Sequence, residues 1–214
     1  MDTARPAVPD LDAALRAAQS GDSGAFCTLY RCTQPWLLRY LRVLTDDDAE
    51  DVASETWLQV ARDMHAFSGG YDSFRGWVVT IGRHRALDQA RRRDRRPRYV
   101  PVPAADLAGL AGLATADDTA AAAIEAVSTD AALRLIATLP PDQAEAVLLR
   151  AVVGLDAKTA GQVIGKRAGA VRSAAHRGLR TLATLLEQAD RACTRAGPAA
   201  GVTRARDLTL KEMR

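Results

Sequence analysis

The chain is poor in cysteine and in aromatic side chains, and it has no long apolar run. Its 214 residues include three cysteines, Cys27, Cys32 and Cys193, too few for a disulfide framework. Cys27 and Cys32 lie five residues apart on a helical pattern with no histidine nearby, which favours ordinary helix residues over a metal or redox pair. No segment has the apolar length of a membrane span, and no apolar signal segment opens the chain. We therefore expect a cytoplasmic protein that holds no metal or cofactor and does not insert into a membrane.

Catalytic constellations are also missing from the sequence. His65, His84 and His176 are isolated from one another, and neither a glycine-rich phosphate loop nor a nucleophile motif is present. We therefore expect no enzymatic activity.

Helix-forming residues dominate what is present. Hydrophobic residues make up 48% of the chain and aromatic residues 5%, while the β-branched alternation typical of strands is scarce. A chain of this length can bury the core of one large domain or of two small ones. The composition predicts an all-α protein.

The charges lie in blocks, although their sum is only +3. Residues 46–55 hold six acids and no base, residues 83–98 hold eight arginines against two aspartates, and residues 158–180 hold six Lys or Arg and no acid. Two basic blocks of this kind indicate a polyanionic partner.

Apolar residues at helical spacing predict helices over residues 11–20, 23–44 and 45–64. Pro35 either kinks the second helix or opens its next turn. Thr45 followed by three aspartates is typical of a helix start, with a hydroxyl cap and acids near the N-terminal dipole. The third helix has a core-facing side, predicted to contain Ala49, Val52, Thr56, Trp57, Val60 and Met64. Its opposite side is polar with one exposed leucine, and contains Asp51, Ser54, Glu55, Leu58 and Arg62.

Residues 67–72 contain the paired glycines of a flexible loop, and a long helix is predicted from about residue 73 to 96. The first half of this helix has a buried face, formed by Phe74, Trp77, Val78 and Ile81. Its arginine-rich second half is either a solubilising helix terminus or a track for a nucleic-acid backbone. Residues 97–128, rich in Ala, Pro, Gly and Asp, are interpreted as a flexible linker between two domains.

Four shorter helices are predicted beyond the linker, over residues 132–139, 141–153, 157–164 and 168–186, followed by a tail. The last two are joined through Gly165, Lys166 and Arg167 and have the proportions of a helix-turn-helix. On the final helix, the residues predicted to face inward are Val171, Ala175, Leu182 and Leu186. Those predicted to face outward are Arg172, Ser173, His176, Arg177 and Arg180. Because residues 158–180 carry only cations, this pattern favours a DNA-binding face over an ordinary solvated one.

Several stretches together resemble a known family, the extracytoplasmic-function (ECF) subgroup of bacterial RNA polymerase sigma factors. They are DDDAEDVASETWLQVARDMHAF, FRGWVVTIGRHRALDQARRRDRR and LPPDQAEAVLLRAVV followed by GLDAKTAGQVIGKRAGAVRSAAHRGLRTL. The resemblance covers residues 22–96 and 130–187, which are similar to sigma regions two and four in the family's order. It implies two small helical domains, a region 2 bundle over 22–96 and a region 4 helix-turn-helix over 129–187, joined by the flexible linker 97–128. Residues 1–21 form an N-terminal segment and residues 188–214 a C-terminal tail in this interpretation.

The resemblance also implies roles for particular residues. The helix matching 46–64 binds core RNA polymerase in the family, which assigns that contact to Asp51, Ser54, Glu55 and Leu58. The loop at 68–73 and the following helix capture and melt the minus-ten promoter element, which implicates Ser68, Trp77, His84, Asp88, Arg91 and Arg92. The last helix reads the minus-thirty-five element as duplex through Arg167, Ala170, Arg172 and Ser173, with His176, Arg177 and Arg180 on phosphates.

The sequence departs from the family's usual pattern at five positions. His84 stands where asparagine is usual, and Arg167 and Ala170 stand where a hydroxyl cap and a threonine are usual. Lys166 replaces a common apolar turn residue, and Gly161 replaces a common alanine. The promoter sequence therefore cannot be transferred from relatives.

The expected function is that of a sigma factor that binds core RNA polymerase, directs it to promoters and assists their melting. In the family an anti-sigma factor is a common further partner. Both DNA-binding faces are expected to be hidden in the free protein. The alternatives are an operator-binding helix-turn-helix regulator, which leaves the acidic helix and the arginine-rich helix without a role, and a helical interaction protein that does not bind DNA.

Overall fold

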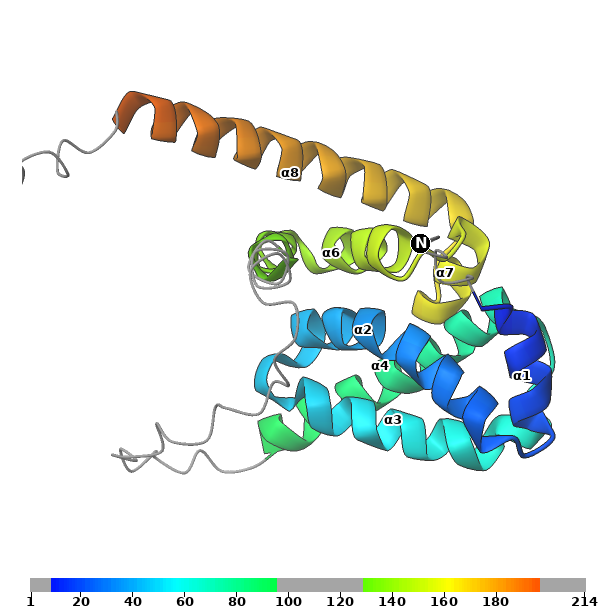
Figure 1. The fold of residues 1–214 in the computed structure, drawn as a ribbon. Coiled ribbons are helices and arrows are strands. Elements are labelled where there is room, and N and C mark those ends of the chain that lie inside the picture. The colour runs from blue at the N-terminus through cyan, green and yellow to red at the C-terminus, as the bar shows by residue number, and fades with distance from the viewer. Residues whose placement is uncertain (1–8, 96–128, 197–214) are drawn as a thin grey trace, which may run out of the picture.

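The computed structural model describes residues 9–95 and 129–196, which form helices, turns and short connections without a strand in either range (Figure 1). The prediction of an all-α fold with two helical regions is confirmed. The N-terminal helices are α1 (Leu11–Gln19), α2 (Ser23–Thr45), α3 (Ala49–Asp63) and α4 (Tyr71–Arg95), with short turns η1 (Asp46–Asp48) and η2 (Met64–Ala66). The C-terminal helices are a segment at 129–137, α6 (Pro141–Val147) continuing into η3 (Leu148–Val152), α7 (Ala157–Ile164) and α8 (Ala168–Ala196). The predicted linker 97–128 and residues 197–214 lie outside the described residues.

The first two helices begin at aspartate caps. The Asp10 carboxylate accepts hydrogen bonds from the backbone N–H groups of Asp12 and Ala13, and Asp22 does the same for Gly24 and Ala25 at the start of α2. Pro35 lies inside α2 without ending it. Pro35 therefore does not start a new helix, because α2 runs unbroken from Ser23 to Thr45.

The predicted helix start at Thr45 is wrong. Thr45 is buried at the end of α2, and its hydroxyl donates to the carbonyl oxygen of Leu41 at 3.0 Å, so it is satisfied by the preceding helix. The three aspartates that follow form η1, and α3 begins at Ala49. Asp48 accepts instead from Arg93 at 2.7 Å and from Gln89 at 3.2 Å, which joins the start of α3 to α4.

The N-terminal bundle is built around α2 and the predicted inner face of α3. Leu37, Tyr40 and Leu41 of α2 are fully buried, and each buried side chain of this size contributes about 1.5–3 kcal/mol of hydrophobic stabilisation. All six residues predicted for the inner side of α3 are buried, and all five predicted for its outer side are exposed. The helical periodicity of this segment was therefore a sufficient guide to its orientation.

The C-terminal helices enclose a second apolar region. Asp156 caps α7, and Gly165, with a φ of +70°, ends it in the left-handed conformation that glycine tolerates best. Gly178 lets α8 approach α6 closely, because a Cβ atom there would lie 2.8 Å from Val147 Cγ2. The buried side chains of both regions form one continuous hydrophobic core.

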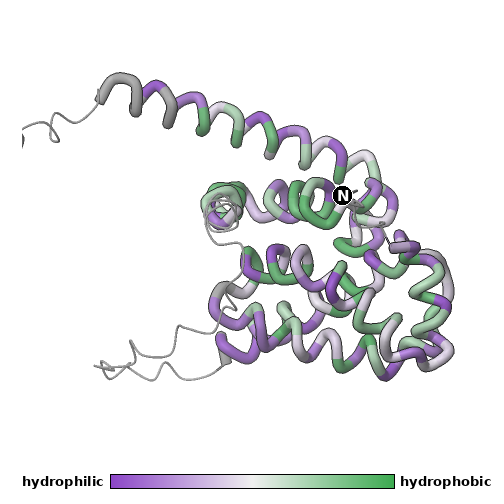
Figure 2. The backbone as a smooth tube through the Cα atoms, viewed as in Figure 1, coloured by the Kyte–Doolittle hydropathy of each residue, from purple (hydrophilic) through white to green (hydrophobic). Residues whose placement is uncertain are grey.

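α8 extends further than the sequence predicts. It continues to Ala196, so residues 188–196 are helical rather than part of a tail, and it projects beyond the other helices (Figure 1). The prediction that Leu186 faces inward is wrong, since 51% of that side chain is exposed beyond the region where α6 lies against α8. Hydrophobic residues are concentrated where α6 and α7 lie, and alternate with polar residues on the projecting part of α8 (Figure 2).

Candidate functional site

The helix-turn-helix is formed by α7, the turn at residues 165–167 and α8. Lys166 stabilises the turn through two interactions. Its backbone N–H donates to Gly161 O at 2.8 Å, and its ammonium pairs with Asp142 of α6. Val171, Ala174 and Ala175 are buried under the first turns of α8. These contacts set the direction in which the opposite side of α8 points.

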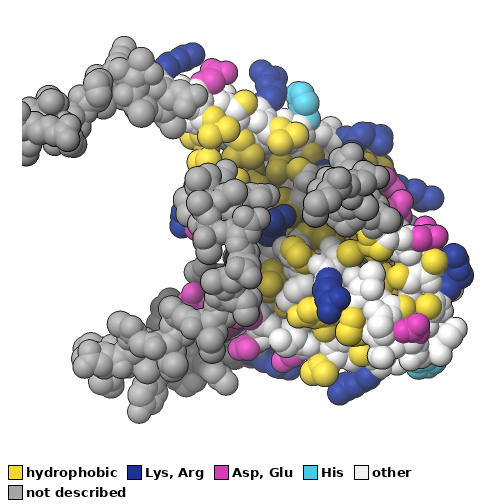
Figure 3. Space-filling model, in the orientation of Figure 1, with side chains coloured by type: hydrophobic (Ala, Val, Ile, Leu, Met, Phe, Trp, Pro, Cys, Tyr) yellow, Lys and Arg dark blue, Asp and Glu magenta, His cyan; other side chains and the backbone are white. Residues whose placement is uncertain are grey.

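That opposite side is exposed and basic. The structure exposes every residue predicted to contact the minus-thirty-five element, namely Arg167, Ala170, Arg172, Ser173, His176, Arg177 and Arg180. Cationic side chains gather along the outer side of α8 (Figure 3). An exposed helix with cations and a serine at its N-terminal end fits a DNA major groove, where base edges and phosphates lie within reach of the same helix.

A second candidate surface follows α4 and the loop that precedes it. α1 fixes the loop, because Gln19 donates to Phe67 O at 2.6 Å and the Tyr71 backbone N–H donates to Asp12 at 2.7 Å. Ser68 is exposed in this loop. At 100° per residue, the α4 residues predicted for the minus-ten element fall within an arc of about 100°. They are Trp77, His84, Asp88, Arg91 and Arg92, of which all but Trp77 are exposed.

Trp77 lies in an aromatic cluster. Its ring stacks on Phe67 with 4.9 Å between ring centroids, and Phe74 lies 5.9 Å away. Asp88 pairs with Arg91 at 3.1 Å. The five α4 residues predicted for the minus-ten element therefore lie on one face of that helix, and Trp77 is the half-buried end of this face.

The third candidate surface is the outer side of α3. Asp51, Ser54, Glu55 and Leu58 are all exposed, and 60% of the Leu58 side chain is accessible. Glu55 lies 3.9 Å from Arg85 of α4. The outer side of α3 is therefore a polar surface with one exposed leucine, as predicted.

Sequence reasoning missed the residues that join the two helical regions. Glu145 of α6 accepts from Tyr40 of α2 at 3.0 Å and from Nε of Arg83 of α4 at 2.6 Å. Burial, and then the Glu145 charge, raise the pKa of the Tyr40 phenol well above its ordinary value, and the hydrogen bond to Glu145 raises the pKa of Arg83. The only sequence signal was an acid in an apolar helix, which does not identify its partners.

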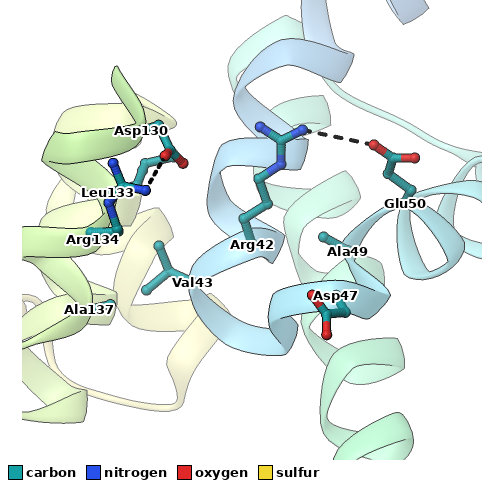
Figure 4. Close-up of a pocket in the computed structure, with 9 residues that line it drawn as sticks. All are labelled: Arg42, Val43, Asp47, Ala49, Glu50, Asp130, Leu133, Arg134 and Ala137. Carbon is teal, nitrogen blue, oxygen red and sulfur yellow. Dashed lines mark ion pairs between the residues drawn. The ribbon is translucent and has the colours of Figure 1, made fainter. Parts of the chain in front are cut away.

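A cavity of about 340 Å³ also lies between the regions, where the end of α2 and the start of α3 face the 129–137 helix (Figure 4). Its charged walls are paired locally, Arg42 with Glu50 at 3.8 Å and Arg134 with Asp130 at 2.6 Å. These pairs leave no convergent set of groups for a small-molecule ligand. Among the described helices, none is both long and apolar enough to cross a membrane.

Comparison with known proteins agrees with this arrangement. Residues 29–96 match the family model described as Sigma-70 region 2, and residues 129–182 match the one described as Sigma-70, region 4. CnrH, in a solved structure with the cytosolic domain of CnrY, has a similar fold over 84% of this chain and 99% of that chain, with a TM-score of 0.55 and 21% identity.

Two curated relatives are more similar in sequence. The ECF RNA polymerase sigma factor ShbA of Streptomyces griseus is 33% identical over 188 residues, covering 83% of this chain and 96% of ShbA. The ECF RNA polymerase sigma factor BldN of Streptomyces coelicolor is 32% identical over 171 residues, covering 79% of this chain but only 63% of BldN. The chain belongs to the ECF family of RNA polymerase sigma factors.

Proposed function

We propose that this sigma factor binds core RNA polymerase through the outer side of α3, captures the minus-ten element along α4 and reads the minus-thirty-five element with α8. The observation that carries the proposal is the helix-turn-helix in which every Lys, Arg, Asp or Glu from residue 158 to 180 is a Lys or an Arg, in a chain of the sigma family. The proposed domains are the region 2 bundle over 22–96 and the region 4 helix-turn-helix over 129–187. Residues 1–21, 97–128 and 188–214 are the flanking and linking segments.

On α8, Arg172 and Ser173 are proposed to reach base edges together with Arg167 and Ala170. His176, Arg177 and Arg180 follow along the helix and hold phosphates. The exposure of all these side chains supports this assignment. Arg167 and Ala170 give this factor a promoter preference of its own, because side-chain identity at base-contacting positions determines which base is accepted.

On α4, Trp77 and Ser68 of the loop are proposed to engage unstacked bases of the minus-ten strand. His84, Asp88, Arg91 and Arg92 continue the path, and the arginines neutralise the backbone. The protein supplies binding energy that favours melted promoter DNA, while catalysis belongs to the polymerase. We place its action in the cytoplasm, where that polymerase transcribes the chromosome.

An anti-sigma protein is proposed as a further partner. The structure of CnrH contains a bound CnrY domain, which is a fact about CnrH. A partner of this kind would reversibly withhold the present factor from polymerase.

Co-purification with bacterial core RNA polymerase tests the proposal. Stable association that Glu55→Lys weakens, and that Arg172→Glu leaves intact, is the expected result. Sequence-specific duplex binding without any association with polymerase would instead identify an operator-binding regulator and overturn the proposal.

A further inference from the structure

The arginine-rich end of α4 is held against the start of α3 by polar side chains. Ala86 is buried, but from residue 87 to residue 93 no side chain of α4 is fully buried. In this part of the helix, Gln89 Nε2 donates to Asp48 Oδ2 at 3.2 Å, and Arg93 Nη2 lies 2.7 Å from Asp48 Oδ1. Because little apolar surface is buried here, the bonds to Asp48 fix the end of α4 in place.

Asp48 directly precedes α3, at the position where a capping residue usually stands. An aspartate there normally accepts hydrogen bonds from the backbone N–H groups of the first turn. The Asp48 side chain makes no such bond, and only 17% of it is exposed. Both of its carboxylate oxygens contact α4 instead. Asp48 therefore joins two helices rather than stabilising the start of one.

The residues of α4 that contact this part of the bundle lie four residues apart. Arg85, Gln89 and Arg93 follow one another on successive turns and therefore share one side of the helix. Arg85 Nη2 donates to Oε1 of Gln59, on α3, at 2.8 Å. This side of α4 is thus bonded to α3, or to the residue before it, on three successive turns.

The arginines proposed to bind the minus-ten strand lie on the neighbouring side of α4. Arg91 pairs with Asp88 at 3.1 Å, and these side chains are 67% and 54% exposed. An exposed pair of this kind is weak and can be replaced by a contact with phosphate. The pair between Arg93 and Asp48 is stronger, because the Asp48 carboxylate is largely buried and would be left without a partner.

We propose that Asp48 is a positioning residue for capture of the minus-ten strand. By holding Gln89 and Arg93, it fixes the end of α4. Arg91 and Arg92 then meet the strand backbone, while Arg93 makes no phosphate contact. This role rests on the proposed function of α4. Neighbouring arginines thus have different tasks, since Arg92 binds DNA and Arg93 keeps the helix in place.

Asp48→Asn tests this role, because position and charge predict opposite results. Removing the acid makes the chain more positive, which by charge alone should tighten binding to any nucleic acid. Loss of the pair with Arg93 should instead weaken binding of a fluorescent 20-nucleotide single strand of random sequence about fivefold. Fluorescence anisotropy measures this affinity for the full chain alone and for its complex with core RNA polymerase. Tighter or unchanged binding by Asp48→Asn would contradict the proposed role.

Asp47→Asn is the matched control. It makes the same change of charge one residue earlier, at an exposed acid that lines the cavity in Figure 4. It should leave strand affinity unchanged or slightly higher. Equal weakening by the two variants would attribute the effect to the loss of an acid and overturn the proposal.

The dependence of strand binding on salt separates a phosphate contact from a positioning residue. Each phosphate contact with a single strand contributes about 0.7 to the steepness with which log affinity falls against log salt concentration, so Arg92→Ala should lower it by about this amount. Arg93→Ala should weaken binding as much as Asp48→Asn but leave the steepness unchanged. Arg93→Lys, which can still pair with Asp48, should retain nearly the wild-type affinity. An equal loss of steepness in the two alanine variants would make Arg93 a DNA contact and overturn the proposal.

Duplex binding shows whether a variant is damaged as a whole. The basic side of α8 belongs to the other helical region, so affinity for a random duplex should change by less than about twofold in Asp48→Asn. Combining Asp48→Asn with Arg93→Ala should weaken strand binding no more than either substitution alone, because both remove the same pair. Parallel loss of duplex and strand affinity, or additive losses in the double variant, would show that Asp48 does not act through Arg93.

Failure of this role and failure of the proposed function give different results. If the wild-type chain binds the strand but does not associate with polymerase, the proposed function is wrong, and comparison of Asp48→Asn with Asp47→Asn still decides the role of Asp48. If polymerase association is intact and the two variants bind the strand alike, only the role of Asp48 is wrong. If the wild type binds no strand, alone or with polymerase, both are wrong.

Discussion

At Gly161 the helix-turn-helix has no room for a side chain. The residue is buried in α7, and a Cβ atom would meet the carbonyl oxygen of Lys166, a backbone atom that cannot rotate away. We predict that Gly161→Ala destabilises the protein by about 1–3 kcal/mol, the usual effect of overpacking. Chemical denaturation followed by circular dichroism measures the change.

At Gly169 the same substitution, glycine to alanine, is expected to have the opposite effect on stability. Gly169 is exposed in the first turn of α8, with no atom near its missing Cβ. Gly169→Ala should stabilise the protein by about 0.5–1 kcal/mol through helix propensity. Destabilisation by both alanines would contradict the packing described for the turn.

The buried phenol of Tyr40 makes the free energy of unfolding depend on pH in the alkaline range. Burial first, and Glu145 second, raise the pKa of the folded-state phenol well above the ordinary value of 10.0. The unfolded chain therefore loses this proton at lower pH, so the contribution is complete below pH 10 and is lost as pH rises through the folded pKa. Tyr40→Phe should cost about 1–2 kcal/mol at pH 7, through the lost hydrogen bond to a charged group, and should lessen the alkaline loss.

Denaturant titrations between pH 7 and pH 11 measure both effects. Tyr30→Phe removes an exposed hydroxyl and serves as the control, with wild-type stability expected at pH 7. An alkaline loss in Tyr40→Phe as steep as in the wild type would assign the effect to other groups.

At the scale of elements, α7 depends on its aspartate cap. The backbone N–H of Thr159, followed by its hydroxyl, lowers the pKa of Asp156 from the ordinary 3.8. Because the folded-state pKa is the lower one, the stabilisation is complete above pH 3.8 and is lost as pH falls through the folded value. Asp156→Asn retains a capping oxygen and should therefore flatten the decrease in melting temperature between pH 6 and pH 3. An unchanged acid profile would show that the cap charge is not coupled to folding.

α8 and α3 are predicted to serve different partners. Arg172→Glu should weaken duplex binding by about 1–3 kcal/mol and reduce its salt dependence, whereas Glu55→Lys should weaken association with polymerase and spare the duplex. Arg191→Glu, at the projecting end of α8, is the charge-reversal control. Fluorescence anisotropy at several salt concentrations and a pull-down with core polymerase measure the two effects. Equal damage to both partners by both substitutions would contradict the assignment of surfaces.

Helical periodicity predicted the orientation of α3, because an amphipathic helix carries its buried face in its own sequence. The same reasoning failed at Thr45 and Leu186, where hydrogen bonding or burial depends on which other helix lies beside the residue. Thr45 is satisfied by α2, and Leu186 lies on the part of α8 that no described helix covers. The partners of Glu145 could not be predicted, since they lie 62 and 105 residues away in the sequence. The exposure of the candidate residues on α3 and α8 could be predicted because helical periodicity is a local property, whereas their roles come from the family resemblance and stay predictions.

At the scale of the whole molecule, one core joins two helical regions whose proposed partners differ. The outer side of α3 and the basic side of α8 both remain exposed, while Glu145 and Arg75 join the two regions. The side chains proposed to contact polymerase and duplex DNA are therefore accessible in the arrangement that the structure describes.

Run-off transcription with purified bacterial core RNA polymerase and a library of genomic fragments tests whether this protein directs the polymerase to promoters. We expect discrete new transcripts that depend on this protein, lost with Glu55→Lys through weaker polymerase binding and with Arg172→Glu through weaker promoter binding. If the polymerase produces the same transcripts with and without the protein, at concentrations where the two associate, the chain does not confer promoter specificity.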